Sequence, residues 1–434
     1  MRDPIGPDIP FSPKQWPIYY GWIVVGAATI GIVASIPGQT MGVSVFTDAL
    51  LEATGLTRLS VSNAYLIGTV LSGLTLPLGG TYVDRFGARI AGAAACVGLG
   101  VHLVYLSQID RISRWMAGDH LGLSFVLLTA GFFGLRLTGQ GLLTMTCRTM
   151  LGRWFEARRG MVAGLSGLFI GFGFGLCPQV FDAWIRYATW RGAWLQMAAV
   201  IVVGMGSIVI VFFRDSPEVC GLQMDGRDEP SRVVQQRDEI HFSRSEALRT
   251  GAFWAVTFAL AAQAMMITGI TFHIVDIGAA VGVAREDTVT LFLPIAAMSV
   301  ISAVVGGTMG DRLPVRALLI ALMISLGIGI YGIADLAQHR SLAILGLGLA
   351  TGLAPPTSTI AYPRFFGRRH LGAIVGVEMM ALVIGSALGP SFLASSRVYF
   401  GEYRPLLMAS LSLPMVSILL SLGFSSPTRR PRSS

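Results

Sequence analysis

Several charged residues lie inside long apolar stretches of this 434-residue chain, and two of them are candidates for the central chemistry. Arg136 is near the middle of the apolar run 121–150, and Glu378 is the acidic residue of the run LGAIVGVEMMALVIGSALGP. An ionised side chain in such a run is unfavourable by several kcal/mol unless it is paired or faces water, so it usually faces a cavity. Arg136 is therefore a candidate for recognising substrate charge. The alternative is a structural role, in a buried ion pair or as a side chain that reaches the membrane surface.

Glu378 is a candidate for proton coupling, because burial disfavours the charged form of a carboxyl group and so favours proton uptake. A proton-coupled carrier needs such a group. The alternative is a permanent ion pair with an arginine of the other half of the chain, for which Arg136 is a candidate. Such a pair could itself be a lock that depends on the conformational state.

Three amide side chains in apolar runs are candidates for hydrogen-bonding a substrate. Gln39 follows Pro37, whose ring breaks a helix locally and lets a polar side chain face a cavity. Gln140 belongs to the same stretch as Arg136, and Gln263 lies in the run that begins near residue 252.

His273 and Asp276 lie in that later run as well, three residues apart. On a helix this spacing puts both side chains on one face, so the pair could share a proton. His273 is accordingly a candidate for substrate binding, and Asp276 is a second candidate for proton coupling. Both lie toward the outer end of the run, where an exposed pair without a role in transport is the alternative.

The elements that must position these residues are membrane-spanning helices. The chain is 53% apolar and 13% charged, with a mean hydropathy of +0.65, whereas about 25% of residues are charged in an average soluble domain. A helix needs about 20 apolar residues to span a bilayer. We find twelve such runs, which predict an all-α polytopic membrane protein: residues 19–47, 60–81, 89–108, 121–150, 160–183, 193–213, 252–280, 288–309, 317–336, 341–362, 371–395 and 405–424.

A hydrophilic stretch between the sixth and seventh runs divides the chain into two halves of six helices each. Of the arginines and the single lysine, 21 lie in the alternate segments that include both termini, and 9 lie in the other loops. The positive-inside rule then places both termini in the cytoplasm, in a multi-pass protein of the cell inner membrane. The predicted parts are a cytoplasmic tail, an N-terminal bundle, a cytoplasmic linker, a C-terminal bundle and a second cytoplasmic tail: residues 1–18, 19–213, 214–251, 252–424 and 425–434.

A ten-residue pattern occurs after the second run and again after the eighth. Residues 80–89 read GTYVDRFGAR and residues 307–316 read GTMGDRLPVR. A weaker repeat joins Arg153-Trp154-Phe155 to Arg364-Phe365-Phe366. Two halves with matching loops imply a pseudo-two-fold axis along the membrane normal and a binding site between the halves.

The charges of this repeated pattern are candidates for a cytoplasmic gate. An aspartate at a helix end and nearby arginines can form charge-assisted bonds that hold one state and break in the other. Alternatively, these charges only anchor the topology at the membrane surface. The gate residues would be Asp84, Arg85, Arg89, Asp311, Arg312 and Arg316.

Several other classes of protein are not supported by the sequence. We find no phosphate-binding Walker loop, no HExxH motif and no G-x-S-x-G nucleophile elbow. The four cysteines are scattered, so neither a metal site nor a disulfide framework is predicted. The arginines lack the aromatic-interleaved pattern of a nucleic-acid-binding surface. We therefore expect no enzyme activity, no cofactor, no metal and no nucleic acid.

The pattern G-x-x-x-D-R-x-G-x-R at residues 80–89 resembles the signature of the major facilitator superfamily, and residues 307–316 resemble its degenerate second copy, with Pro314 in place of Gly87. Arg136 begins an R-x-x-G-x-G element similar to that of the fourth helix in this superfamily. The resemblance implies a role for Arg136 in substrate charge recognition or proton coupling.

Three further segments are similar to the oxalate/formate antiporter and monocarboxylate transporter branch of the superfamily. They are Tyr20-Gly21-Trp22, residues 153–160 (RWFEARRG) and residues 366–372 (FGRRHLG). This resemblance implies small organic anions as substrates, exchanged or carried with protons. In the branch, a basic residue of the eighth or eleventh helix meets the carboxylate; here neither helix has one, and Glu378 lies in the eleventh.

The main prediction is a secondary active transporter that moves a small organic anion, a mono- or dicarboxylate, by proton symport or anion exchange with alternating access. Two alternatives remain open. One is a proton-coupled exporter of drugs or amphipathic metabolites, which a cavity lined by aromatic and methionine side chains would favour, with Arg136 bound structurally. The other is a membrane sensor that binds a ligand without transporting it.

Overall fold

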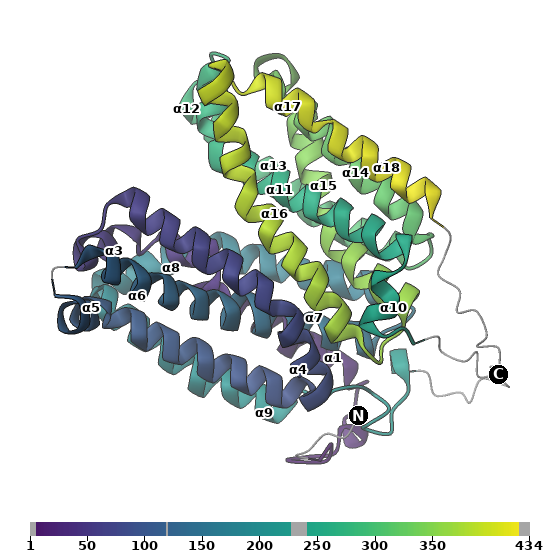
Figure 1. Cartoon of the computed structure of the whole chain (residues 1–434). Helices are drawn as coiled ribbons and strands as arrows, with labels where there is room; N and C mark the ends of the chain where they lie inside the picture. Colours follow the sequence, from purple (N-terminus) through teal and green to yellow (C-terminus); the bar gives the residue numbers. More distant parts are fainter. Residues whose placement is uncertain (1–5, 119, 227–240, 425–434) are drawn as a thin grey trace. The chain divides into compact units, whose positions relative to one another are not determined.

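The structure is a computed structural model that describes residues 6–118, 120–226 and 241–424 (Figure 1). These residues form helices joined by short turns, and no strand occurs among them. Part of the predicted linker (227–240), the first five residues of the predicted N-terminal tail and the whole predicted C-terminal tail lie outside the described residues.

Membrane-spanning helices make up most of the described chain. Ten helices there are long and apolar enough to cross a bilayer, and α1 (Gly21–Ala34) is a shorter apolar helix. One of the ten, α4 (Arg58–Ser107), contains the second and third predicted runs, so these helices account for all twelve runs. The non-helical residue inside α4 is Gly87, with φ of 82°. The predicted all-α polytopic fold is confirmed.

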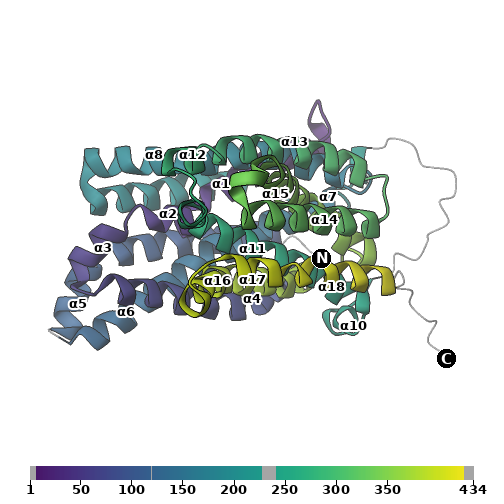
Figure 2. The same ribbon diagram turned by 90° about the horizontal axis from the view of Figure 1, so that it is seen from above.

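Contacts divide the chain into two compact units. The first unit comprises Met1–Trp154, Phe169–Arg227 and Val375–Met380, and the second comprises the remaining residues. Figure 2 shows long helices of the first unit lying side by side. Besides α1 and α4, its helices are α2 (Thr40–Ser44), α3 (Thr47–Thr54), α5 (Ile109–Ala117), α6 (Leu121–Arg136), α7 (Thr144–Trp154), most of α8 (Arg159–Ala199), α9 (Gly206–Phe212), the π-helical segments Leu137–Leu143 and Val200–Met205, and the 3-10 turns Pro13–Gln15, Ile36–Gly38 and Met224–Gly226.

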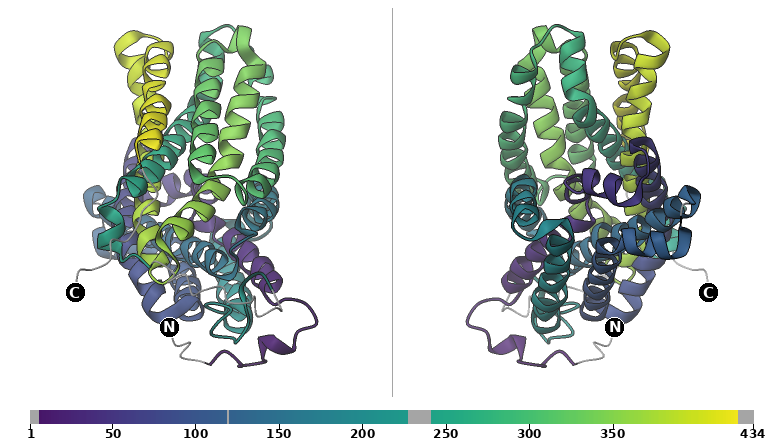
Figure 3. Two further views of the ribbon diagram at one scale, coloured as in Figure 1. Left: turned by 90° about the vertical axis from the view of Figure 1, so that its right-hand side faces the viewer. Right: turned by 90° about the vertical axis from the view of Figure 1, so that its left-hand side faces the viewer.

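The second unit begins with the first turns of α8 and continues after the linker. Close packing of small residues holds its helices together: a Cβ atom at Gly346 would lie 2.1 Å from the backbone nitrogen of Gly329 on the neighbouring helix. Figure 3 shows long helices of this unit running side by side. Its other helices are α10 (Arg244–Leu248), α11 (Gly251–Ala280), α12 (Arg285–Val289), α13 (Phe292–Gly310), α14 (Val315–Ala334), α15 (Leu336–Phe366), most of α16 (Leu371–Phe400), α17 (Arg404–Ser410) and α18 (Ser412–Gly423).

The described part of the N-terminal tail is bound to the first unit by two buried arginines. Arg214 is fully buried and donates from Nε to the carbonyl oxygen of Pro7 (2.8 Å) and from Nη2 to that of Ile9 (2.9 Å). Arg89 donates from Nη1 to the carbonyl oxygen of Gly6 (3.1 Å). Backbone carbonyls of the tail therefore satisfy cations that the helices bury.

An ion-pair cluster connects α5 to α8 outside the apolar runs. Asp110 accepts hydrogen bonds on Oδ2 from Arg191 (2.5 Å) and from Arg114 (2.8 Å). Burial acts to raise the pKa of this carboxyl. The hydrogen bond and charge of Arg191, the backbone amide of Arg111 and the hydrogen bond of Arg114 outweigh burial and hold the pKa of Asp110 below its usual range.

Candidate functional site

Arg136 lies where α6 ends and the π-helical segment Leu137–Leu143 begins. Its side chain is directed to the break after α1, where the 3-10 turn Ile36–Gly38 contains a proline. Nη1 of Arg136 donates to the carbonyl oxygen of Gly38 (3.2 Å) and lies 3.5 Å from the hydroxyl of Thr40. The local break predicted at Pro37 thus supplies a backbone acceptor to the guanidinium.

Tyr65 of α4 completes the surroundings of Arg136. The guanidinium carbon lies 5.4 Å from the centroid of the Tyr65 ring, within the range of a cation–π contact. The Tyr65 hydroxyl donates to the Thr40 hydroxyl (2.9 Å), which fixes both groups beside the guanidinium.

The charge of Arg136 has no acidic partner in the part of the chain that the structure describes. The residue is 3% exposed, and its described neighbours are a carbonyl, a hydroxyl and an aromatic ring. A buried guanidinium without a carboxylate is unfavourable in an apolar environment. Neutral groups therefore orient this cation without neutralising it.

Gln39 and Gln140 belong to the two elements that meet at this arginine: Gln39 follows Gly38, and Gln140 follows Arg136 by four residues. Gly38 packs against the π-helical segment so closely that a Cβ atom would lie 2.8 Å from Cα of Gly139. Nε2 of Gln39 donates to the Ser35 hydroxyl (3.1 Å). Oε1 of Gln140 is buried and accepts no hydrogen bond from the described residues, so it is available to a donor.

Glu378 forms an ion pair with Arg148, not with Arg136. Oε1 of Glu378 lies 3.2 Å from Nη2 of Arg148 on α7, and both residues belong to the first unit. The Glu378 side chain is fully buried, whereas that of Arg148 is 21% exposed. The suggested ion pair between Glu378 and Arg136 is therefore not formed in this structure. The partner of Glu378 is Arg148, which lies in the same apolar run as Arg136.

Gln263, His273 and Asp276 all lie on α11 in the second unit. Nε2 of Gln263 lies 3.5 Å from the carbonyl oxygen of Ala350. His273 is bound at both ring nitrogens, by the carbonyl oxygen of Pro390 (3.0 Å) and the hydroxyl of Tyr403 (3.3 Å).

The predicted proton sharing between His273 and Asp276 has a loose geometry in this structure. The two side chains are 4.0 Å apart, and the Asp276 side chain is 68% exposed. This arrangement is closer to the exposed rim pair that the sequence left open.

The first copy of the repeated pattern is bound by residues outside it. Oδ1 of Asp84 lies 2.6 Å from Nη2 of Arg153, and the two side chains are 9% and 2% exposed. Arg89 is buried and donates from Nε to the carbonyl oxygen of Phe213 (3.2 Å). Arg85 is exposed, with its guanidinium 5.2 Å from the centroid of the Phe86 ring.

The second copy is bound differently. The Asp311 carboxylate accepts from the backbone amides of Gly160 (2.7 Å) and Met161 (3.1 Å), at the first turn of α8. Arg364 donates to carbonyl oxygens of the loop itself, at Leu313 (2.7 Å) and Asp311 (3.0 Å).

The two arginines of this second copy lie at the periphery. Arg316 donates to the carbonyl oxygen of Phe424 and contacts its ring. Arg312 is exposed.

Sequence reasoning missed Thr40, Tyr65 and Arg148 as neighbours of the candidate site. A tyrosine or threonine in an apolar run gives no signal of its own, because both occur in ordinary helix packing. Arg148 did carry a signal, since it is a charge within an apolar run. Among the described residues, no group of three or more His, Cys, Asp or Glu side chains is placed to hold a metal ion.

The sequence profile of the Major Facilitator Superfamily matches residues 25–390. The chain belongs to this superfamily. Its members are transporters, so the prediction of a transporter and not an enzyme is confirmed. The protein is therefore a multi-pass membrane protein, in agreement with its apolar helices.

Individual relatives are distant. The transporter is 24% identical to monocarboxylate transporter 13 of Bos taurus, over 95% of this chain and 92% of that protein. It is 22% identical to the oxalate:formate antiporter of Oxalobacter formigenes, over 54% of this chain and 50% of that protein. It is also 22% identical to the multidrug transporter protein MdtP of Bacillus subtilis (strain 168), over 54% of this chain and 39% of that protein.

A solved structure shows the same fold. The proton:xylose symporter XylE, bound to 6-bromo-6-deoxy-D-glucose, aligns with a TM-score of 0.68 at 15% identity, over 93% of this chain and 94% of that chain. At this identity the similarity concerns the fold alone.

The predicted resemblance to the monocarboxylate and oxalate/formate transporters is confirmed by the sequence matches to monocarboxylate transporter 13 and to the oxalate:formate antiporter.

Proposed function

We propose that this superfamily transporter is a secondary active carrier of a small organic anion, a mono- or dicarboxylate, working by proton symport or anion exchange. The observation that carries the proposal is the state of Arg136. Its buried guanidinium is oriented by Gly38, Thr40 and Tyr65, none of which neutralises it. A substrate carboxylate would supply the missing charge through charge-assisted hydrogen bonds.

The amides of Gln39 and Gln140 would select the rest of the substrate. Gln140 offers a buried carbonyl oxygen, which needs a donor such as a substrate hydroxyl, a protonated carboxyl or a water molecule. Gln39 offers an amide donor that now binds Ser35. Similarity to monocarboxylate transporter 13 over nearly the whole chain supports an anionic substrate.

Glu378 is the proposed proton-coupling residue. When ionised, its buried carboxylate is compensated by Arg148 at 3.2 Å. Protonation would remove the attraction that joins the two side chains, so the pair can act as a two-state contact that proton binding releases. Asp276 is the weaker candidate, because its side chain is 68% exposed and lies 4.0 Å from His273, without a close ion-pair contact such as that of Glu378.

Alternating access would let the carrier expose the site to one side of the membrane at a time. The two repeated loops are the proposed cytoplasmic gate, through Asp84 and Asp311. The distribution of arginine supports an inner-membrane orientation with both termini in the cytoplasm. One chain contains both halves, so a monomer is the proposed functional unit.

Uptake into proteoliposomes tests the proposal. Vesicles preloaded or not with a panel of carboxylates, with and without an imposed pH gradient, would be compared for wild type, Arg136→Gln, Arg136→Lys and Glu378→Gln. Arg111→Gln is the matched control, because Arg111 is exposed and binds Gln108. Arg136→Gln should reduce carboxylate flux about ten- to a hundredfold, as expected for the loss of hydrogen bonds from a charged group. Arg136→Lys should be intermediate, because it keeps the charge and loses the planar fork.

Glu378→Gln should abolish accumulation driven by the pH gradient and retain exchange. If folded protein shows no flux of any carboxylate, the anion assignment is wrong. Proton-driven movement of an amphipathic cation would then support the exporter alternative, which the partial similarity to MdtP favours. Binding without counterflow would support the sensor.

A further inference from the structure

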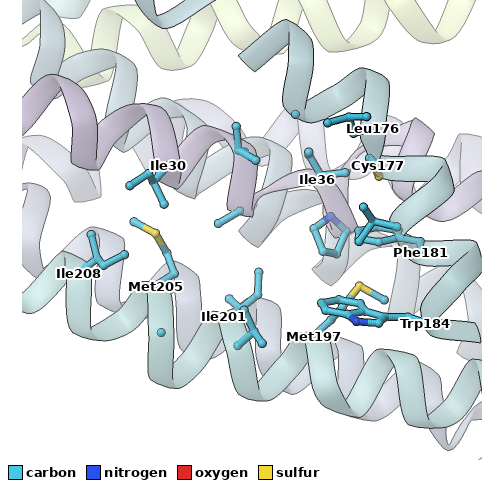
Figure 4. Close-up of a pocket in the computed structure, with 17 residues that line it drawn as sticks. Ile30, Ile36, Leu176, Cys177, Phe181, Trp184, Met197, Ile201, Met205 and Ile208 are labelled. Carbon is cyan, nitrogen blue, oxygen red and sulfur yellow. The ribbon is translucent and has the colours of Figure 1, made fainter. Parts of the chain in front are cut away.

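A cavity of about 440 Å³ lies within the first unit, between α1, α8 and the π-helical segment Val200–Met205 (Figure 4). The side chains that line it are hydrocarbon apart from the sulfur atoms of Cys177 and two methionines and the indole of Trp184. Water in this cavity would find almost no hydrogen-bonding partner, so its natural content is apolar.

The cavity continues into apolar surface at the level of the membrane-spanning helices. Ile30, Leu176 and Val200 line it and remain 50%, 56% and 56% exposed. Surface of this kind on a membrane-spanning helix is covered by lipid hydrocarbon. A lipid chain is therefore the apolar ligand that is already present at the opening.

Two features of the backbone make this space. The wall formed by Val200–Met205 is π-helical, a rare conformation that occurs frequently at functional sites. Gly204 on this wall has no side chain, and a Cβ atom there would meet nothing within 4 Å. Because Gly204 lines the cavity, a larger residue at this position has open space for a side chain beside the cavity.

We propose that this cavity binds one acyl chain of a bilayer phospholipid. The bound chain would contact Ile36 and Pro37, which line the cavity and immediately precede the Gly38 carbonyl that binds Arg136. The lipid would thus support the turn that orients this arginine. Binding of the lipid does not depend on which substrate the transporter carries.

Photolabelling of the full chain in liposomes tests the site. The probe is phosphatidylcholine with a diazirine in the middle of one acyl chain, and labelled peptides are located by mass spectrometry. Label should be enriched on residues 176–184 and 197–208 relative to Val97 and Val101, exposed residues of α4 outside the cavity. Gly204→Leu should lower the cavity label about tenfold, because its side chain excludes roughly two methylenes of the acyl chain.

Gly26→Leu is the matched control, since a Cβ atom at Gly26 also meets nothing within 4 Å and Gly26 does not line the cavity. It should leave the labelling unchanged. Ala34→Leu, from the α1 wall, is a second filling variant if Gly204→Leu does not fold. Equal labelling of the cavity and of Val97 and Val101 in wild type would show ordinary contact with surrounding lipid only, and would overturn the proposal. So would cavity label that both filling variants leave intact.

Discussion

The two copies of the repeated ten-residue pattern bind their aspartates in different ways. In the first copy, Asp84 forms a buried ion pair with the side chain of Arg153. In the second, Asp311 caps the first turn of α8 through the amides of Gly160 and Met161. Arg364, which stands where the weaker repeat places a counterpart of Arg153, binds carbonyl oxygens of the second loop.

The backbone of the two loops explains part of this difference. Gly87 has a positive φ of 82°, and its lack of a Cβ leaves room for the Asp215 carboxylate, which accepts from the amide of Ala88. Pro314 stands at the matching position with φ of −66° and is the N-cap residue of α14. The two copies thus share their charged residues, but the aspartate of the first copy binds an arginine side chain and the aspartate of the second binds backbone amides.

Removing the charge of Asp84 should have the largest effect on stability. Asp84→Asn leaves the buried guanidinium of Arg153 with the Asp215 carboxylate at 3.7 Å as its described ion-pair partner. We expect a loss of about 3 kcal/mol in the free energy of unfolding, as for other broken buried pairs. Thermal unfolding in detergent, followed by tryptophan fluorescence, measures it. Asp182→Asn is the control, because its pair with Arg186 is exposed, and an equal shift in the two variants would contradict the argument.

Alanine substitutions at the matching positions Gly87 and Pro314 should have the next largest effect on stability. Gly87→Ala places a Cβ atom 2.3 Å from an oxygen of Asp215, at a backbone conformation that alone costs about 1–2 kcal/mol for a residue with a side chain. Pro314→Ala requires no such conformation and should lower stability by about 1 kcal/mol or less. Comparing the two midpoints of unfolding checks the asymmetry, and a larger loss in Pro314→Ala would refute it.

The cap of the second copy should contribute less than the ion pair of the first. Asp311→Ala removes the acceptor of two amides, and a lost cap typically costs about 1 kcal/mol. Asp311→Asn retains one carbonyl oxygen and should lose about half of that. Hydrogen exchange of residues 160–162 measures the cap locally. Faster exchange confined to the first turn of α8 in Asp311→Ala is the expected result, and unchanged exchange there would exclude the cap.

The sequence predicts the helices of this protein well and the partners of its charges poorly. Apolar runs reveal spanning helices because each must match the bilayer, and Pro37 reveals the break that faces Arg136. The sequence does not reveal which arginine packs near Glu378, and in the structure its ion-pair partner is Arg148. The π-helical segment after Arg136 was not predicted either, because one inserted residue in a helix leaves no periodic signal in an apolar run.

The smallest effects are expected at Arg85 and Arg312, which follow the two aspartates in the repeated pattern. Both are exposed, and the described contact of Arg85 is with the Phe86 ring. Arg85→Ala and Arg312→Ala should each change stability by less than about 0.5 kcal/mol, as is usual for surface residues. Transport assays with equal amounts of protein then distinguish the two roles that the sequence allows for these arginines, a cytoplasmic gate and an anchor of the topology. A lower rate with unchanged stability would place these arginines in the gate, whereas an unchanged rate would leave them as charges that anchor the topology.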